Sequence, residues 1–196
     1  MKNVFKKCLL AALALTLVGK VSAVGVGGWV GYNLASGVDS SACDLYKGTG
    51  GECSKGGLSL GGDLWLITLP GMPLKLGLGA AYIPVAYQKY SISGATSELS
   101  TRYIPVYAEG RFDIAGFFFG ATLGYGISTS TASASATAGT TTVNTSVTAA
   151  GGTVTVGAFG GYSIGMGPAS IDLGARLFSL SSTWNLMPFI GATISF

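Results

Sequence analysis

The last thirteen residues, 184–196, carry an apolar side chain at every second position. The apolar positions are Trp184, Leu186, Pro188, Ile190, Ala192, Ile194 and Phe196. The residues between them are mostly small or polar. A period of two is that of a β-strand, whose successive side chains point to opposite faces. A strand that is apolar on one face and polar on the other is what a β-barrel in a lipid bilayer requires.

The N-terminus predicts export from the cytoplasm. A basic start at 1–7 is followed by an apolar stretch at 8–18 and by Val21-Ser22-Ala23, which fits a small-residue cleavage site. We therefore interpret 1–23 as a signal peptide and 24–196 as one barrel domain. The apolar stretch is well short of the roughly 20 residues that a spanning helix needs, so we do not interpret it as a membrane anchor.

The composition of 24–196 points in the same direction. Four of the eleven Lys and Arg residues lie in 1–23, which leaves seven against eight acidic residues, and so a net charge of about −1. This balance gives no reason to expect nucleic-acid binding. Residues beyond 24 are rich in glycine and poor in charge, and they contain no run that approaches a spanning helix. The sequence predicts an all-β protein, an eight-stranded antiparallel up-and-down transmembrane β-barrel.

Eight alternating segments support this strand number. We expect strands at about 24–34, 58–68, 74–86, 100–112, 116–128, 152–164, 168–179 and 184–196. Each segment exceeds the roughly 9–11 residues that cross a bilayer at a tilt. Short connections rich in Gly and Pro are predicted at 70–73, 113–116 and 165–168. Longer ones are predicted at 35–57, 87–99, 129–151 and 180–183. Short periplasmic turns alternating with longer outer loops are typical of this architecture.

Aromatic residues on the predicted lipid face gather near the strand ends. The expected girdle residues are Phe112, Phe117, Tyr162 and Phe196 at the periplasmic side, and Tyr32, Tyr82, Tyr125 and Trp184 at the outer side. Such belts mark the two membrane interfaces. A soluble barrel would carry its apolar residues inside and its charges outside, and the charges of this chain fall on the opposite face.

The predicted lumen contains equal numbers of acids and bases. The inward charged residues are Asp63, Lys75, Glu109, Arg111, Asp172 and Arg176. Because buried charges persist only when paired, we expect a network of ion pairs. One hypothesis is a gate in a narrow pore, and the other, which the small lumen favours, is a static core that fixes strand register. Inward glycines leave room for Trp29, Trp65, Phe118 and Phe159.

The first and third outer loops have distinct compositions. Cys43 and Cys53 both lie in the first outer loop, and an oxidising compartment predicts a structural disulfide between them. The segment 128–152 consists almost wholly of Ser, Thr, Ala and Gly. It fits a disordered loop, and it fits equally an extension of the flanking strands into a hairpin above the membrane.

Catalysis is not expected. Gly161-Tyr162-Ser163-Ile164-Gly165 matches the nucleophile-elbow pattern, but that motif needs a strand-to-helix turn and a histidine base, and the chain has no histidine. The lack of histidine and of clustered cysteine also argues against a transition-metal site. We therefore expect no enzyme activity, no cofactor and no metal.

Over nearly its whole length after 23, the chain resembles the small outer-membrane barrels of the outer membrane protein A transmembrane-domain, X or W type. The resemblance rests on the first strand Val24-Gly-Val-Gly-Gly-Trp-Val-Gly-Tyr32, the eight-strand layout and the terminal Ile194-Ser195-Phe196. It departs from that pattern at Ile194, where such chains often carry an aromatic residue.

The resemblance implies a monomer in the outer membrane of a Gram-negative bacterium, surrounded by lipid and lipopolysaccharide. It also implies that the barrel assembly machinery reads Phe196. Two functions are compatible with it. The first is a non-enzymatic barrel that supports the envelope and presents outer loops to a surface ligand. The second is a narrow porin-like channel for small or apolar solutes.

Overall fold

The computed structural model describes residues 24–35, 43, 47, 50–68, 72–92, 95–138, 141–180 and 183–196. The predicted signal peptide at 1–23 lies outside this part, as do residues 70–71 and 139–140 of the predicted turns. No helix among the described residues combines the length and apolar character needed to cross a membrane.

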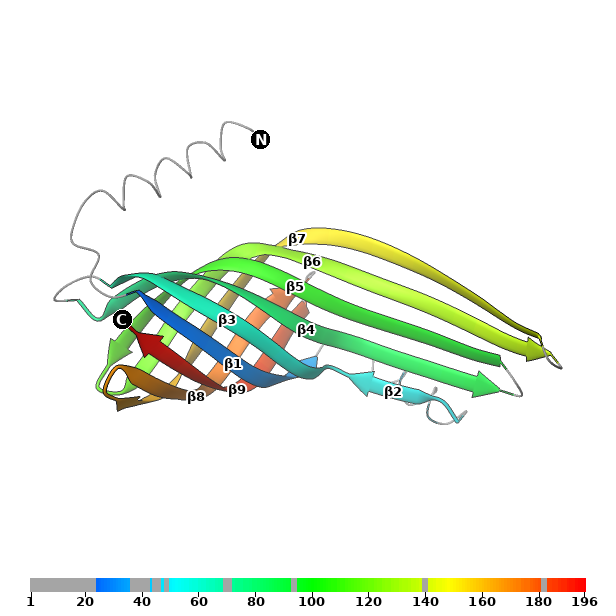
Figure 1. Cartoon of the computed structure of the whole chain (residues 1–196), viewed down its shortest axis with the longest axis horizontal. Coiled ribbons are helices and arrows are strands. Elements are labelled where there is room, and N and C mark those ends of the chain that lie inside the picture. Colours follow the sequence, from blue (N-terminus) through cyan, green and yellow to red (C-terminus); the bar gives the residue numbers. More distant parts are fainter. Residues whose placement is uncertain are drawn as a thin grey trace, which may run out of the picture.

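Nine antiparallel strands make up the described chain, and eight of them close into a barrel (Figure 1). They are β1 (Gly25–Ala35), β2 (Glu52–Lys55), β3 (Gly57–Thr68), β4 (Leu74–Ile92), β5 (Ala95–Ile114), β6 (Phe117–Ala138), β7 (Thr141–Met166), β8 (Ala169–Leu180) and β9 (Thr183–Ser195). With β2 left aside, each strand of the ring pairs with the next one along the chain, and β1 pairs with β9 to close the ring. Short β2 lies outside the ring, paired with β4. The predicted eight-stranded up-and-down barrel is confirmed.

The barrel wall turns its apolar side chains outward. On β9, Trp184 and Ile190 are 50 and 54% exposed and Phe196, directly after the strand, is 78% exposed, whereas Asn185 and Met187 are fully buried. On β6 the outward apolar band runs from Phe117 to Ile127. Ten residues at about 3.3 Å each, tilted by roughly 40°, span about 25 Å, the height of the apolar band of a membrane barrel.

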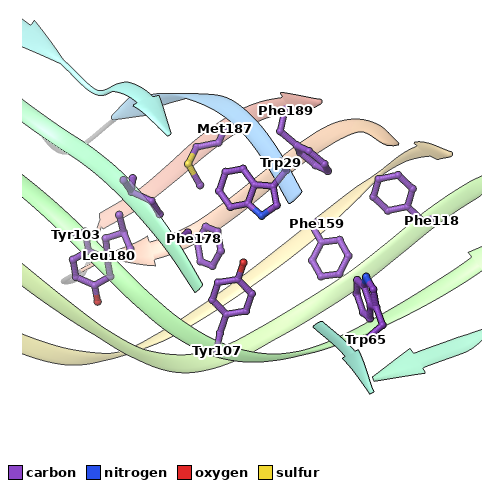
Figure 2. Close-up of a cluster of buried hydrophobic side chains, with 12 residues drawn as sticks. Trp29, Trp65, Tyr103, Tyr107, Phe118, Phe159, Phe178, Leu180, Met187 and Phe189 are labelled. Carbon is purple, nitrogen blue, oxygen red and sulfur yellow. The ribbon is translucent and has the colours of Figure 1, made fainter. Parts of the chain in front are cut away.

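Aromatic side chains fill much of the interior (Figure 2). The buried apolar cluster comprises Trp29, Trp65, Ala81, Ile83, Tyr103, Tyr107, Phe118, Phe159, Phe178, Leu180, Met187 and Phe189. Glycines on facing strands provide the space. A Cβ added at Gly126 would collide with the Tyr103 ring, and one at Gly61 would collide with the Trp29 ring. Any larger residue at these two positions would displace the ring that occupies the lumen.

Strands β4 to β7 are much longer than predicted and project beyond the rest of the barrel (Figure 1). The predicted outer loop at 87–99 is wrong, because β4 runs to Ile92 and β5 begins at Ala95. A register shift between Pro84 and Ala86 exchanges the two faces of β4, which hides the alternation in the sequence. The segment 128–152 forms the extended hairpin rather than a disordered loop, since β6 pairs with β7 as far as Ala138 and Thr141. We call this projecting sheet the arm; it comprises residues 86–92, 95–102, 128–138 and 141–153.

The two faces of the sheet exchange polarity where the arm begins. Ile104, Ile127 and Val154 are the last large apolar residues on the outward faces of β5, β6 and β7. The β5–β6–β7 registers continue without a shift, so the next residues on that face are known. They are Thr96, Glu98, Ser100 and Arg102 on β5, Thr129, Thr131, Ser133, Ser135 and Thr137 on β6, and Thr142, Asn144, Ser146, Thr148, Ala150 and Gly152 on β7. The change from apolar to hydroxyl side chains marks the upper edge of the lipid-facing surface.

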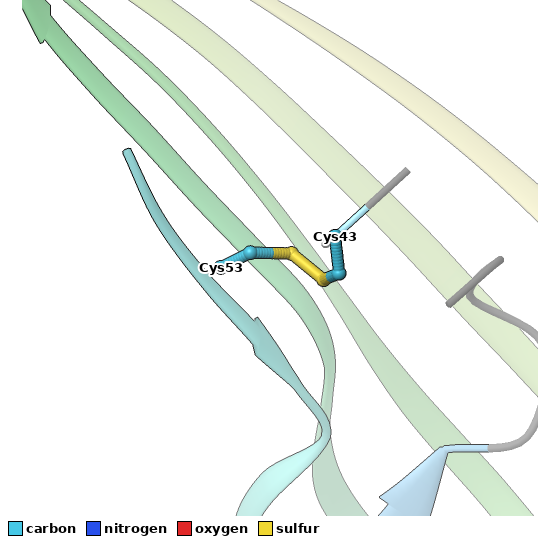
Figure 3. Close-up of a disulfide and its surroundings, with 2 residues drawn as sticks. All are labelled: Cys43 and Cys53. Atoms are coloured by element: carbon cyan, nitrogen blue, oxygen red, sulfur yellow. A yellow bond between two sulfur atoms is a disulfide. The ribbon is translucent and has the colours of Figure 1, made fainter. Parts of the chain in front are cut away.

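Strand β2 covers part of one edge of the arm. It pairs with β4 from Glu52 opposite Lys89 to Lys55 opposite Ala86. The predicted disulfide is present: Cys53 of β2 is bonded to Cys43, which is almost fully buried (Figure 3). The sequence did not reveal β2, because a four-residue strand inside a polar loop has too few positions to show a period.

A charge introduced on the outward face tests where the lipid-facing surface ends. Leu123 lies near the middle of the apolar band, and Thr131 lies on the same face of the same strand but within the arm. We expect Leu123→Arg to lower the free energy of unfolding by about 2–4 kcal/mol, because the guanidinium would enter the hydrocarbon. Thr131→Arg should change it by less than about 0.5 kcal/mol. Denaturant titration in lipid vesicles, followed by tryptophan fluorescence, measures both values. Equal effects of the two substitutions would contradict the assigned boundary.

Candidate functional site

The best-defined polar site is the barrel interior, where two arginines meet acids from other strands. Arg111 of β5 binds Asp172 of β8 through two parallel contacts, of which Nη2 to Oδ1 measures 3.1 Å. Its Nε donates to Oδ1 of Asp113 at 2.8 Å. Lys75 lies 3.1 Å from the other oxygen of Asp113 and is partly exposed. The first cluster therefore runs from the buried lumen to the end of the barrel that carries the β3–β4, β5–β6 and β7–β8 turns, which we call the lower mouth.

A second cluster lies deeper and is centred on Arg176 of β8. Its Nη2 donates to Oδ2 of Asp63 at 2.6 Å, and its Nη1 donates to the hydroxyl of Tyr107 at 3.2 Å. That hydroxyl donates to the second oxygen of Asp63 at 2.9 Å. Arg176, Asp63 and Tyr107 thus form a closed triangle of hydrogen bonds across the lumen between β3, β5 and β8.

Glu109 is the least satisfied member of this cluster. Its carboxylate lies 3.5 Å from Nη1 of Arg176, yet neither of its oxygens has a hydrogen-bond partner among the described residues. The side chain is completely buried. Two carboxylates therefore share one guanidinium, and removal of that guanidinium would leave both buried without a counter-charge.

Aromatic rings surround both guanidinium groups. The Arg176 guanidinium carbon lies 4.8 Å from the Trp29 ring centre, 4.9 Å from that of Phe159 and 5.1 Å from that of Phe189. The Arg111 guanidinium carbon lies 4.1 Å from the centre of Phe118. A planar guanidinium can bind carboxylates in its plane and stack rings on its faces, so these contacts complement the ion pairs. Rings and guanidinium groups therefore pack against one another inside the lumen.

The structure places all six charges singled out in the sequence on the inward face. Asp63, Glu109, Arg111, Asp172 and Arg176 are buried, and Lys75 lies at the lower mouth. It brings them together as two clusters rather than one network.

Sequence reasoning missed Asp113 and Tyr107. Asp113 was assigned to the turn 113–116, although its odd number continues the inward series Glu109, Arg111 on β5 and was the available signal. Tyr107 belongs to the same series, but no sequence pattern indicates that its hydroxyl reaches Asp63.

The eight expected girdle residues all face outward. Phe117 packs edge-on against Tyr162 with ring centres 5.2 Å apart, and Phe112 stacks on Phe119 at 5.6 Å. The other girdle residues are Tyr32, Tyr82, Tyr125, Trp184 and Phe196, and all five are exposed. Their role at the membrane interfaces and the role of Phe196 in assembly remain predictions.

Ser163, the centre of the elbow-like motif, lies within strand β7, directly opposite Asp172 of β8. It therefore lies beside the first charge cluster. Within the described residues, no group of three or more His, Cys, Asp or Glu side chains is arranged to hold a metal ion.

Fold and interior together define a small eight-stranded transmembrane β-barrel with a packed polar and aromatic core. No protein-family model and no curated protein matches the sequence. Solved structures of small outer-membrane β-barrel proteins do match. The attachment invasion locus protein of Yersinia pestis matches at 15% identity and a TM-score of 0.45, over 89% of this chain and 97% of that one.

Two further structures match over a similar share of the chain. Neisserial surface protein A shows 15% identity and a TM-score of 0.43, over 89% of this chain and 96% of that one. A major outer membrane protein from Thermus thermophilus shows 13% identity and a TM-score of 0.48, over 88% of this chain and 99% of that one. All three TM-scores lie below 0.5, so the fold assignment rests on the strand pairing of this chain itself.

Removing the central guanidinium tests the second cluster. We expect Arg176→Met to lower the free energy of unfolding by about 3–5 kcal/mol, because Asp63 and Glu109 would remain buried and unpaired. The triple variant Arg176→Met, Asp63→Asn, Glu109→Gln should regain much of this loss, since no charge is then buried. Lys75→Met, which removes a partly exposed partner, should cost no more than about 1 kcal/mol. The measurement is denaturant unfolding in vesicles, and equal stability of the wild type and Arg176→Met would contradict this assignment.

Proposed function

We propose that this chain is a non-enzymatic surface protein of the bacterial outer membrane, in which the barrel anchors the arm and holds it above the membrane. The observation that carries this proposal is the combination of a filled lumen with a wall that is raised on one side only. A barrel built to conduct would keep its interior open, whereas a barrel built as an anchor needs only a stable core.

The packing of the interior supports an anchor over the alternative, a narrow channel. Arg176 contacts Asp63, Tyr107 and Glu109 and lies against aromatic rings, so any movement of its side chain would break these contacts. Arg111 is held equally by Asp172 and Asp113 at a lower level. Opening a continuous path would require breaking charged contacts at two levels, each between groups that would then be buried unpaired.

The exterior supports the proposed location. The apolar band of about 25 Å, with aromatic residues at its two ends, fits the hydrocarbon layer of an outer membrane. Above it, the hydroxyl-rich outward face of the arm lies at the height of the lipopolysaccharide saccharides. We assign lipid and lipopolysaccharide as surrounding partners and the assembly machinery as the partner of Phe196, whose side chain is 78% exposed at the chain end.

The arm is the part proposed to make contacts with a surface ligand. Its four strands are continuously paired, from Ile92 opposite Ala95 to Ala138 opposite Thr141, so it is a stiff sheet rather than a set of loose loops. A stiff sheet loses little conformational entropy when a partner binds it.

Single-channel recording of the refolded protein in a planar bilayer tests the proposal. We expect no discrete conductance steps, because the lumen is occupied at two levels. Only protein that shifts its mobility on heating in a denaturing gel should be used, since this shift reports a folded barrel. A porin added afterwards to the same bilayer provides the positive control. Reproducible steps from the folded wild-type protein would overturn the anchor function and favour the channel.

A further inference from the structure

The two long edges of the arm differ in how they are protected. The β4 edge is partly covered by β2, carries Lys89, and is tied to the first outer loop by the disulfide at Cys53. On the other side, β8 pairs with β7 only from Gly157 to Met166, where β7 is still inside the barrel wall. Among the described residues, the stretch 141–154 of β7 therefore has a strand partner on one side only.

This β7 edge lacks the devices that usually prevent edge-to-edge pairing. The stretch 141–154 contains no charged residue and no proline, and its pairing with β6 runs without a bulge. Thr155 marks where the edge begins, since its hydroxyl donates to the carbonyl of Ser179 at 2.8 Å as β8 turns away. Unpaired backbone groups in a strand of this length form a template for another strand.

The side chains beside this edge are separated by polarity. The arm's inner face carries the large apolar residues Tyr90, Ile92, Leu99, Val143 and Val147, whereas Tyr87 lies on the outer face. Its charged residues, Lys89, Glu98 and Arg102, lie on the outer face. Val143 and Val147 are 65 and 68% exposed, and Val143 helps to line an apolar hollow of about 300 Å³ between the hairpin tips. A strand added at β7 would need apolar side chains on the inner face and uncharged polar ones on the outer face.

Strand β7 itself meets most of this requirement, since its inner face carries Val143, Val147 and Ala149 beside Thr141 and Thr145, and its outer face carries only uncharged polar residues from 142 to 148. When two copies pair antiparallel about a two-fold axis at Thr145, Val143 of each copy lies opposite Val147 of the other, on the inner face. On the outer face, Asn144 of each copy lies opposite Ser146 of the other. No like charges meet at any position from 141 to 149, because this stretch has none. The pattern is therefore complementary to its own inverted copy.

The direction of β7 fixes where the second copy must be. In every copy, β7 runs from the tip of the arm down to the membrane, so two copies in one membrane would present parallel strands. Antiparallel pairing places the second barrel in an opposed membrane. From Val154 to Thr145 the strand rises about 30 Å, or somewhat over 20 Å after a tilt of roughly 40°, so the two apolar surfaces would lie about 45 Å apart.

We propose that the β7 edge is a homotypic contact site, at which a second copy of this chain in an opposed membrane pairs antiparallel about Thr145. The inference rests on the proposed surface function and names its partner. It assigns to the arm a role in membrane-to-membrane contact, carried by backbone hydrogen bonds and by the four valines of the joined sheets.

Charges introduced at Thr145, the residue on the two-fold axis, test this register. Vesicles carrying refolded protein in two colour-labelled populations should cluster, as read by light scattering and by energy transfer between the populations. Thr145→Lys in both populations should slow clustering at least tenfold, because Lys would face Lys at the axis, and Thr145→Glu should do the same. Thr145→Lys vesicles mixed with Thr145→Glu vesicles should cluster again. The controls are Ser133→Lys and Ser133→Glu, which place the same charges on the outer face of interior strand β6, away from the free edge, and should leave clustering unchanged.

A crosslink provides a second readout that does not depend on charge. Thr145→Cys should form disulfide-linked dimers across clustered vesicles under mild oxidation, whereas Ser133→Cys should not. The proposal is overturned if wild-type vesicles fail to cluster, if Ser133→Lys abolishes clustering as Thr145→Lys does, or if the mixed charges fail to restore it. Barrel insertion, arm orientation by external proteolysis, and conductance are measured on the same protein. A failure of homotypic contact with an inserted, silent barrel would therefore leave the proposed anchor function standing.

Discussion

The pairing of β1 with β9 is the interaction on which the rest of this structure depends. From Gly25 opposite Ser195 onward, it joins the two ends of the sheet and leaves no open edge within the apolar band. In hydrocarbon an unpaired backbone group costs several kcal/mol, so a closed ladder is the condition for an apolar exterior. Closure also determines what the interior contains, because the side chains that alternate with the lipid-facing ones must all fit into one narrow lumen.

The interior follows from that confinement. Charges that a strand turns inward are buried away from bulk water, and so Arg111 and Arg176 are bound by carboxylates and stacked on rings. The arm shows the complementary case. Once β7 rises above the lipid, water can hydrogen-bond its unpaired backbone groups, so a free edge is tolerated there. The long uncharged edge 141–154 is then available for pairing with another strand.

The sequence predicted those parts of the fold that cross the hydrocarbon, where side chains alternate between the lipid and the lumen with a period of two residues. The terminal strand, the inward parity of the six charges and the outward girdle residues all follow from it. Sequence reasoning reached the arm only in part. The hairpin at 128–152 was one of two alternatives, because Ser, Thr and Ala give little contrast between the faces, and the extensions of β4 and β5 were missed, because the shift after Pro84 breaks the alternation of β4.

The pairing of charges was also beyond the sequence. Asp63 and Arg176 are 113 residues apart, and the stagger of the closed strands decides that they meet. Asp113 was missed for a different reason. It was assigned to a turn, although it follows Glu109 and Arg111 at a spacing of two residues and so faces the lumen with them.

Residue-resolved amide hydrogen exchange of the protein in lipid nanodiscs tests the closed ladder most directly. Closure predicts that the amides of the β1–β9 seam, such as those around Val26 and Ile194, exchange as slowly as those of the β5–β6 pair around Ala108 and Leu123. It also predicts fast exchange for those amides of 141–154 that point away from β6 and so have no strand partner. Seam amides that exchange as fast as those of the free β7 edge would contradict a closed barrel.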